Sequence, residues 1–122
     1  MRNILLIIYL SLTPIFVATA ATDIDSMECV LAKMPSGDRL VKLDELASDK
    51  GQGLDYKYYA DRLLKEAELS KDDTYKGNAL FQIIRYYYSR NIDSMYFFIK
   101  KAEPIYLAQK RYEDLCWIKG WY

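Results

Sequence analysis

Apolar residues recur at spacings of three and four along most of the chain, the pattern of helices that bury one face. The two clearest segments are 56–69 and 93–106. The six stripes are Met27, Val30, Leu31 and Met34; Leu40, Leu43, Leu46 and Ala47; Tyr56, Tyr59, Ala60, Leu63, Leu64 and Ala67; Leu80, Ile83, Ile84 and Tyr87; Met95, Phe98, Ile99, Ala102 and Tyr106; and Tyr112, Leu115, Cys116 and Trp117. No segment of appreciable length alternates with period two, so the sequence predicts an all-α fold.

Polar and helix-breaking residues set the expected boundaries between these helices. Asp38 is expected to cap the second helix, and Gly51 to stop it. The polar turn at 71–74 can cap the fourth helix, and Asp93 is expected to cap the fifth. Pro104 is expected to interrupt the fifth helix with a kink, because a proline inside a helix removes a backbone hydrogen bond. The short connections favour antiparallel neighbours.

Residues 1–20 have the three parts of a secretory signal peptide. A short positive start precedes a mainly apolar run at 4–17, and a small-x-small site follows at 18–20. The apolar run is shorter than the roughly 20 residues that cross a bilayer. The sequence therefore predicts cleavage after Ala20 and an exported mature chain of residues 21–122. An uncleaved anchor and a buried helix are the alternatives.

The charge balance and the missing histidine exclude several function classes. Lys and Arg number 17, as do Asp and Glu, and no basic block suggests a nucleic-acid surface. The chain has no histidine, which excludes acid–base catalysis by histidine and metal sites with histidine ligands. We expect no metal site and no cofactor. Cys29 and Cys116 either pair as a disulfide, which export would permit, or act as small apolar residues. Lys110 and Arg111 are expected on a solvated helix face.

A similar apolar stripe appears twice, 35 positions apart. The positions Ala60, Leu64 and Ala67 recur as Met95, Ile99 and Ala102. Each copy would be the second helix of a helix pair that follows a short polar turn. A period of this length with two helices per unit is typical of a helical solenoid, in which each pair buries its stripe against the next pair.

Residues 91–102 resemble the second helix of a tetratricopeptide repeat. In that family a small residue is followed by an aromatic residue four positions later and by alanine three positions after that. Met95, Ile99 and Ala102 occupy these three positions, and the likeness extends over 55–122. The resemblance implies antiparallel helix hairpins stacked into a solenoid, with the first helix of each pair lining a concave groove.

The layout of the whole chain resembles the exported N-terminal regions of membrane-anchored sensor histidine kinases and related regulators of anaerobic Gram-negative bacteria. The shared features are an Asp-Ser helix start at 25–26, a break at Pro35 and tyrosine-rich helix pairs. This resemblance implies a periplasmic sensing segment, with a membrane helix and a signalling part encoded after Tyr122. It implies that residues 21–122 are the N-terminal part of a longer protein and carry no kinase chemistry.

Tyr86 and Tyr88 are the candidate binding residues. Consecutive helical residues point about 100° apart, so Tyr86, Tyr87 and Tyr88 cannot share one buried stripe. Tyr87 fits the stripe, whereas Tyr86 and Tyr88 either pack against a neighbouring helix or contact a ligand. The tetratricopeptide-like arrangement would place this helix on the groove, which implies that Tyr86 and Tyr88 line it.

These features predict a non-catalytic periplasmic segment that senses a signal or binds a protein within a membrane-anchored signalling protein. Its partner would be a protein, a peptide or a small ligand in the groove. Formation of a homodimer is a further possibility that the sequence leaves open. No nucleic acid is expected. The alternative is a stand-alone secreted scaffold that binds another exported protein. A helical enzyme using Asp, Glu and Tyr is a third hypothesis, although no set of acids has site-like spacing.

Overall fold

The computed structural model describes residues 23–48 and 55–120. Within these two ranges the chain forms six α-helices and no strand, which confirms the predicted all-α class. No helix in these ranges has the length and apolar character needed to cross a bilayer. The chain divides after Met34 into two compact units. The predicted signal peptide at 1–20 and the predicted helix stop at Gly51 lie outside the described residues.

The first unit contains α2 (Asp23–Ala32), where the sequence predicts a helix. Two turn hydrogen bonds follow its end, from Lys33 N to Val30 O (3.2 Å) and from Met34 N to Leu31 O (3.1 Å). Leu31 is buried, whereas Val30 is 46% exposed. The predicted stripe of this helix is therefore only partly buried.

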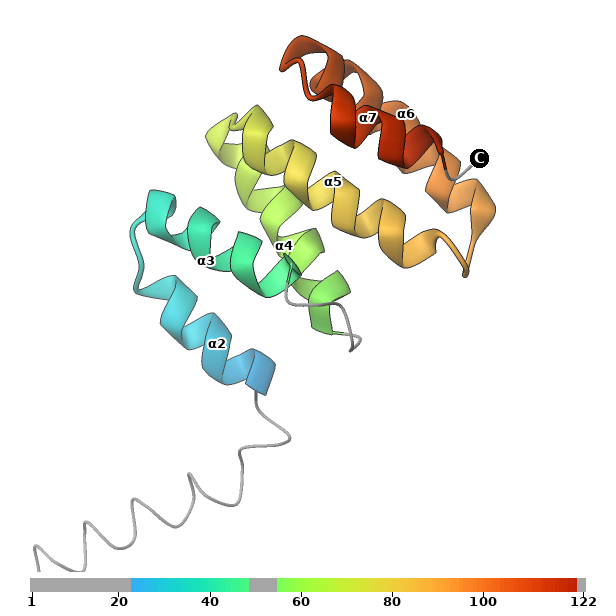
Figure 1. The fold of residues 1–122 in the computed structure, drawn as a ribbon. Helices are drawn as coiled ribbons and strands as arrows, with labels where there is room; N and C mark the ends of the chain where they lie inside the picture. The colour runs from blue at the N-terminus through green and yellow to red at the C-terminus, as the bar shows by residue number, and fades with distance from the viewer. Residues whose placement is uncertain (1–22, 49–54, 121–122) are drawn as a thin grey trace, which may run out of the picture. The chain divides into compact units, whose positions relative to one another are not determined.

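The second unit contains five helices that pack in chain order, as in a solenoid (Figure 1). They are α3 (Ser36–Ser48), α4 (Asp55–Ser70), α5 (Asp73–Tyr87), α6 (Ile92–Ala108) and α7 (Tyr112–Lys119). Each helix packs against the next, and α5 also contacts both α3 and α7. As a result α3, α5 and α7 share one face of the unit, while α4 and α6 lie behind them (Figure 1).

A core of seven buried side chains joins α5, α6 and α7. Its members are Leu80, Ile84, Met95, Ile99, Ala102, Tyr106 and Ile118. Tyr87 and Phe98 pack against this core, with their rings stacked at a centroid distance of 5.7 Å. All of these residues except Ile118 belong to the predicted stripes, and Ile118 comes directly after the last stripe. Hydrophobic spacing therefore predicts most of this core.

The buried face of α7 differs from the predicted stripe. Ile118 is fully buried, but Trp117 is 57% exposed. Cys116 is also exposed, as is Cys29 in α2, and both thiols are free. The expectation that Cys29 and Cys116 act as small apolar residues on a helical stripe is therefore wrong, because both side chains are exposed.

Side-chain caps begin α5 and α6. Asp72 Oδ1 accepts a hydrogen bond from Tyr75 N (3.1 Å), which confirms the predicted capping turn at 71–74. In α6 the cap is Asn91, whose Oδ1 accepts a hydrogen bond from Ser94 N (3.0 Å). The predicted cap at Asp93 is wrong, because asparagine caps as well as aspartate and comes two residues earlier.

The start of α3 also precedes the predicted cap. The helix begins at Ser36, and Arg39 N donates to Pro35 O (2.9 Å) in its first turn. Asp38 therefore lies within the first turn instead of at the cap. Its carboxylate still interacts favourably there with the positive end of the helix dipole.

The C-terminal ends of α4 and α6 have the same backbone geometry. Lys71 (φ 56°), directly after α4, and Lys110 (φ 57°), two residues after the last residue of α6, adopt the left-handed conformation. In each case the next residue donates its N–H to the carbonyl five positions earlier, at 2.9 Å and 2.8 Å. This is the Schellman motif, in which glycine is the usual left-handed residue. The two ends lie 39 positions apart (110 minus 71).

The buried positions of α4 and α6 align at this same offset of 39. The matched buried pairs are Tyr56 with Met95, Ala60 with Ile99, Leu63 with Ala102, and Ala67 with Tyr106. The predicted offset of 35 matches only Ala60 with Met95 and Ala67 with Ala102 among fully buried residues. The two offsets differ by four residues, about one helical turn, so the same stripe fits both. The helix ends and the larger number of matched buried pairs both favour the offset of 39.

The fifth predicted helix is not interrupted at Pro104. Helix α6 runs through Pro104 to Ala108. The flanking residues Ala102 and Tyr106 are both fully buried in the core. Packing on both sides of the proline therefore holds the helix together despite the missing backbone hydrogen bond.

Replacing Pro104 with alanine should raise the free energy of unfolding by about 2 kcal/mol. Alanine is favoured over proline inside a helix by about 3 kcal/mol, and the freer unfolded chain removes about 1 kcal/mol of this gain. Urea denaturation of the purified chain measures the change. Pro35→Ala, at an exposed position before α3, is the control: it frees the unfolded chain in the same way without a gain inside a helix, so it should lower the free energy of unfolding by about 0.4–1 kcal/mol. No gain for Pro104→Ala would mean that α6 is already adapted to its proline.

Candidate functional site

Tyr86 lies in the contact between α4 and α5. Its ring meets the ring of Tyr56 edge-on, with centroids 6.0 Å apart. The guanidinium of Arg90 lies 4.3 Å from the Tyr86 ring centroid, and Lys57 Nζ lies 5.3 Å from it. These are the contacts of helix packing, reinforced by cation–π attraction. A ligand contact by Tyr86 stays a prediction.

Tyr88 is the C-terminal cap residue of α5 and is 54% exposed. Tyr87, between the two candidates, is half-buried and stacks on Phe98. The structure thus separates the three tyrosines as the predicted 100° rotation requires. A ligand contact by Tyr88 also stays a prediction.

A polar cavity of about 270 Å³ opens on the face shared by α3, α5 and α7. It is lined by Asp44 and Ser48 from α3; Asn78, Phe81 and Gln82 from α5; and Arg111 and Asp114 at the start of α7. Tyr86 and Tyr88 are not among these lining residues. The cavity brings together three helices that are separated along the chain, and we take it as the candidate site.

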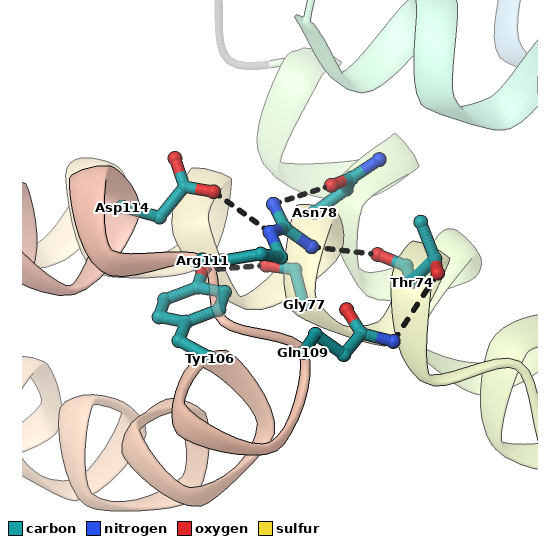
Figure 2. Close-up of polar contacts among 7 residues, drawn as sticks. All are labelled: Thr74, Gly77, Asn78, Tyr106, Gln109, Arg111 and Asp114. Carbon is teal, nitrogen blue, oxygen red and sulfur yellow. Dashed lines mark hydrogen bonds and ion pairs between the residues drawn. The ribbon is translucent and has the colours of Figure 1, made fainter.

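Arg111 joins α5 to α7 at this cavity (Figure 2). Its Nε donates to Asp114 Oδ2 (2.7 Å), its Nη2 to Asn78 Oδ1 (2.7 Å) and its Nη1 to Thr74 O (3.1 Å). Each guanidinium nitrogen therefore has a partner. The side chain is only 20% exposed, so the predicted solvated face at Arg111 is wrong.

Gly77 allows α6 and α7 to approach α5 closely (Figure 2). Tyr106 is fully buried, and its hydroxyl donates to Gly77 O at 2.6 Å. A Cβ atom at position 77 would lie 2.6 Å from Arg111 Nη1 and 3.0 Å from Tyr106 Cε1. Any larger residue at position 77 would therefore displace Arg111 from the cavity wall.

The carboxyl group of Asp44 is held in a partly desolvated position. Burial raises the pKa of Asp44 above its ordinary value. A side-chain hydrogen bond with Asn78 and the positive charge of Arg111 act in the opposite direction, while the charge of Glu45 adds to the rise. Because the pKa is raised overall, the ionised carboxylate is less well stabilised in the folded chain than in water.

Two further polar groups near the cavity differ in how well they are satisfied. Burial raises the pKa of Tyr106, which keeps its hydroxyl protonated as the donor to Gly77. Gln82 Oε1 is buried and has no hydrogen-bond partner in the described structure. An unsatisfied buried acceptor is uncommon in folded proteins.

The chemistry of the cavity is that of binding through hydrogen bonds and charge. Among residues 23–48 and 55–120, no three Cys, Asp or Glu side chains come together as a metal site. The lining offers two carboxylates, two amides, one hydroxyl and one aromatic ring around a guanidinium whose three nitrogens each donate one hydrogen bond.

Sequence reasoning missed these lining residues. Asp44, Asn78 and Arg111 are 34 and 33 positions apart and belong to no motif. The one local signal is the spacing of Arg111 and Asp114, three residues apart at the start of a helix, where such pairs interact. Comparisons with protein-family models, with curated proteins and with solved structures each found no match.

Proposed function

We propose that the chain is a non-catalytic, exported segment that binds a partner or ligand on the shared face of α3, α5 and α7, within a membrane-anchored signalling protein. The observation that supports this best is the polar cavity on that face. It is built from three helices and held open by Arg111, which bridges α5 and α7. Ligand sites typically form in such hollows between helices.

The proposal includes a repeated helix-pair architecture. In it, α3 with α4 and α5 with α6 are successive pairs, and α7 begins a third. The order of packing and the matching ends of α4 and α6 support this assignment. The offset of 39 is longer than the 34 residues of a tetratricopeptide repeat, so the pairs would form a related but longer unit.

The proposed periplasmic location rests on residues 1–20. Expression of the full chain in a Gram-negative host, followed by cell fractionation and intact mass measurement, tests this part. We expect a periplasmic product that begins at Ala21. A cytoplasmic product that retains residues 1–20 would contradict export and remove the signalling role proposed for it.

The gene sequence after codon 122 distinguishes the proposed function from the stand-alone scaffold. A membrane span followed by a cytoplasmic signalling part would support the sensing role. A stop codon soon after Tyr122 would instead favour a scaffold whose shared face holds another exported protein.

A further inference from the structure

We propose that the cavity on α3, α5 and α7 binds a primary ammonium group on an alkyl chain, such as a lysine side chain of a bound peptide. This inference rests on the proposed function and specifies the ligand chemistry of the same site. It follows from which hydrogen-bonding groups of the lining are already used and which have capacity left.

The guanidinium of Arg111 is engaged within the protein. Arg111 donates from all three guanidinium nitrogens, to Asp114, Asn78 and Thr74. Asn78 accepts from Arg111 and also shares a side-chain hydrogen bond with Asp44. A ligand that brings only acceptors, such as a carboxylate or a phosphate, would compete with these partners for the guanidinium of Arg111.

The hydrogen-bond acceptors of the cavity lining can take further hydrogen bonds. A carboxylate has two oxygens that together take several hydrogen bonds, and only one oxygen of Asp114 is used by Arg111. Asp44 presents a second carboxylate, and Gln82 Oε1 has no partner. An ammonium group supplies three donors and no acceptor, which matches this inventory.

The net charge of the cavity lining also favours a cationic ligand. Asp44 and Asp114 contribute two negative charges and Arg111 one positive charge, so the lining carries a net charge of −1. Arg111 forms its ion pair with Asp114 at 2.7 Å, whereas in the described structure it acts on Asp44 through its charge without an ion pair. A cation placed beside Asp44 would offset the unfavourable burial of its charge.

The size of the cavity favours one side chain or a small amine. About 270 Å³ falls below the range of pockets that enclose drug-sized ligands. Lysine joins an alkyl chain to a compact charge, and its stem can stay on apolar surface while the ammonium reaches polar groups.

Calorimetric titration of the purified chain with three probes tests the inference. The probes are the blocked peptide acetyl-Gly-Lys-Gly-amide, its norleucine analogue, which lacks the ammonium, and free n-pentylamine. We expect the lysine peptide to bind at least about tenfold more tightly than the norleucine peptide, since a hydrogen bond to a charged group is worth about 1.5–3 kcal/mol. Equal binding of lysine and norleucine peptides, or no binding of either ammonium probe, would overturn it.

The titration with n-pentylamine distinguishes a lysine side chain from a free amine as the source of the ammonium group. Tighter binding of the lysine peptide than of n-pentylamine would assign the site to a lysine within a chain. Equal or tighter binding of n-pentylamine would support recognition of the ammonium alone and assign the site to free amines. Binding of the norleucine peptide as tightly as the lysine peptide would refute ammonium recognition while leaving the proposed binding face intact.

Two matched variants place the effect at the cavity. Asp44→Asn should weaken binding of the lysine peptide about tenfold, whereas Glu45→Gln should change it by less than about twofold. Both remove one negative charge from neighbouring positions of α3, but only Asp44 lines the cavity. An equal effect of the two variants would show long-range attraction by net charge and refute the site.

Melting of the Asp44→Asn variant separates lost binding from lost folding. Because burial raises the pKa of Asp44, the folded chain holds its proton more tightly than the unfolded chain, and the ionised group lowers stability once the pH exceeds the folded pKa. The neutral asparagine removes this effect, so the melting temperature at pH 7 should be unchanged or higher. Weaker binding together with a clearly lower melting temperature would point to damage of the fold and contradict the assigned role of Asp44.

Discussion

Replacing Tyr106 with alanine should lower the free energy of unfolding by about 3–5 kcal/mol, the range for removing a large buried aromatic side chain. Tyr106 is fully buried in the core between α5, α6 and α7, and its hydroxyl donates to Gly77 O at 2.6 Å. Its loss would open a cavity under Arg111, whose guanidinium lies 4.9 Å from the ring centroid. Urea denaturation of the purified chain measures the effect.

Two further variants divide the effect of Tyr106 into its parts. Tyr106→Phe keeps the ring and removes the hydrogen bond to Gly77, so it should cost about 1 kcal/mol. Tyr112→Ala removes a tyrosine that is 57% exposed in α7 and should cost less than about 0.5 kcal/mol. Similar costs for Tyr106→Ala and Tyr112→Ala would contradict the burial of Tyr106.

The second large effect is expected for Leu80→Ala, which should lower the free energy of unfolding by about 2–5 kcal/mol. Leu80 is fully buried on α5, and its cluster includes Ile99 of α6 and Ile118 of α7. Truncation therefore removes contacts at the junction of three helices. The same denaturation measurement applies, with Leu69→Ala as control, because Leu69 is 74% exposed near the end of α4. A Leu80→Ala cost as small as that of the control would mean that this junction is not a packed core.

The helices themselves could be predicted because their spacing is local. In α4 and α6 the buried residues recur every three or four positions, so a single window of sequence indicates both the helix and its inner face. The capping turn at Asp72 was predictable for the same reason, since its acceptor and its donor are three residues apart.

The ends and lengths of the helices were harder to predict because packing overrides local preference. Lys71 and Lys110 adopt a left-handed conformation that glycine normally marks, so residue type does not indicate the left-handed position at either stop. Pro104 would break an isolated helix, but buried residues on either side keep α6 continuous. The offset between α4 and α6 was also ambiguous by about one helical turn, because the same apolar stripe fits offsets of 35 and 39.

The candidate site was not predictable from residue type. Tyrosine clusters suggest binding because tyrosine is common at interfaces, yet Tyr86 is engaged in packing against Tyr56. The cavity depends on Asp44, Asn78 and Arg111, which come together only when α3, α5 and α7 align. Such contacts between residues more than 30 positions apart need the tertiary fold.

The central claim is that α5 lies between α3 and α7, so that these three helices share one face. Nuclear Overhauser contacts from the side-chain amide protons of Asn78 in the purified chain test it most directly. We expect contacts to Asp44 on one neighbouring helix and to Arg111 at the start of the other. Strong contacts between α3 and α6 or α7, with none from Asn78 to Asp44 or Arg111, would indicate a closed bundle and contradict the shared face.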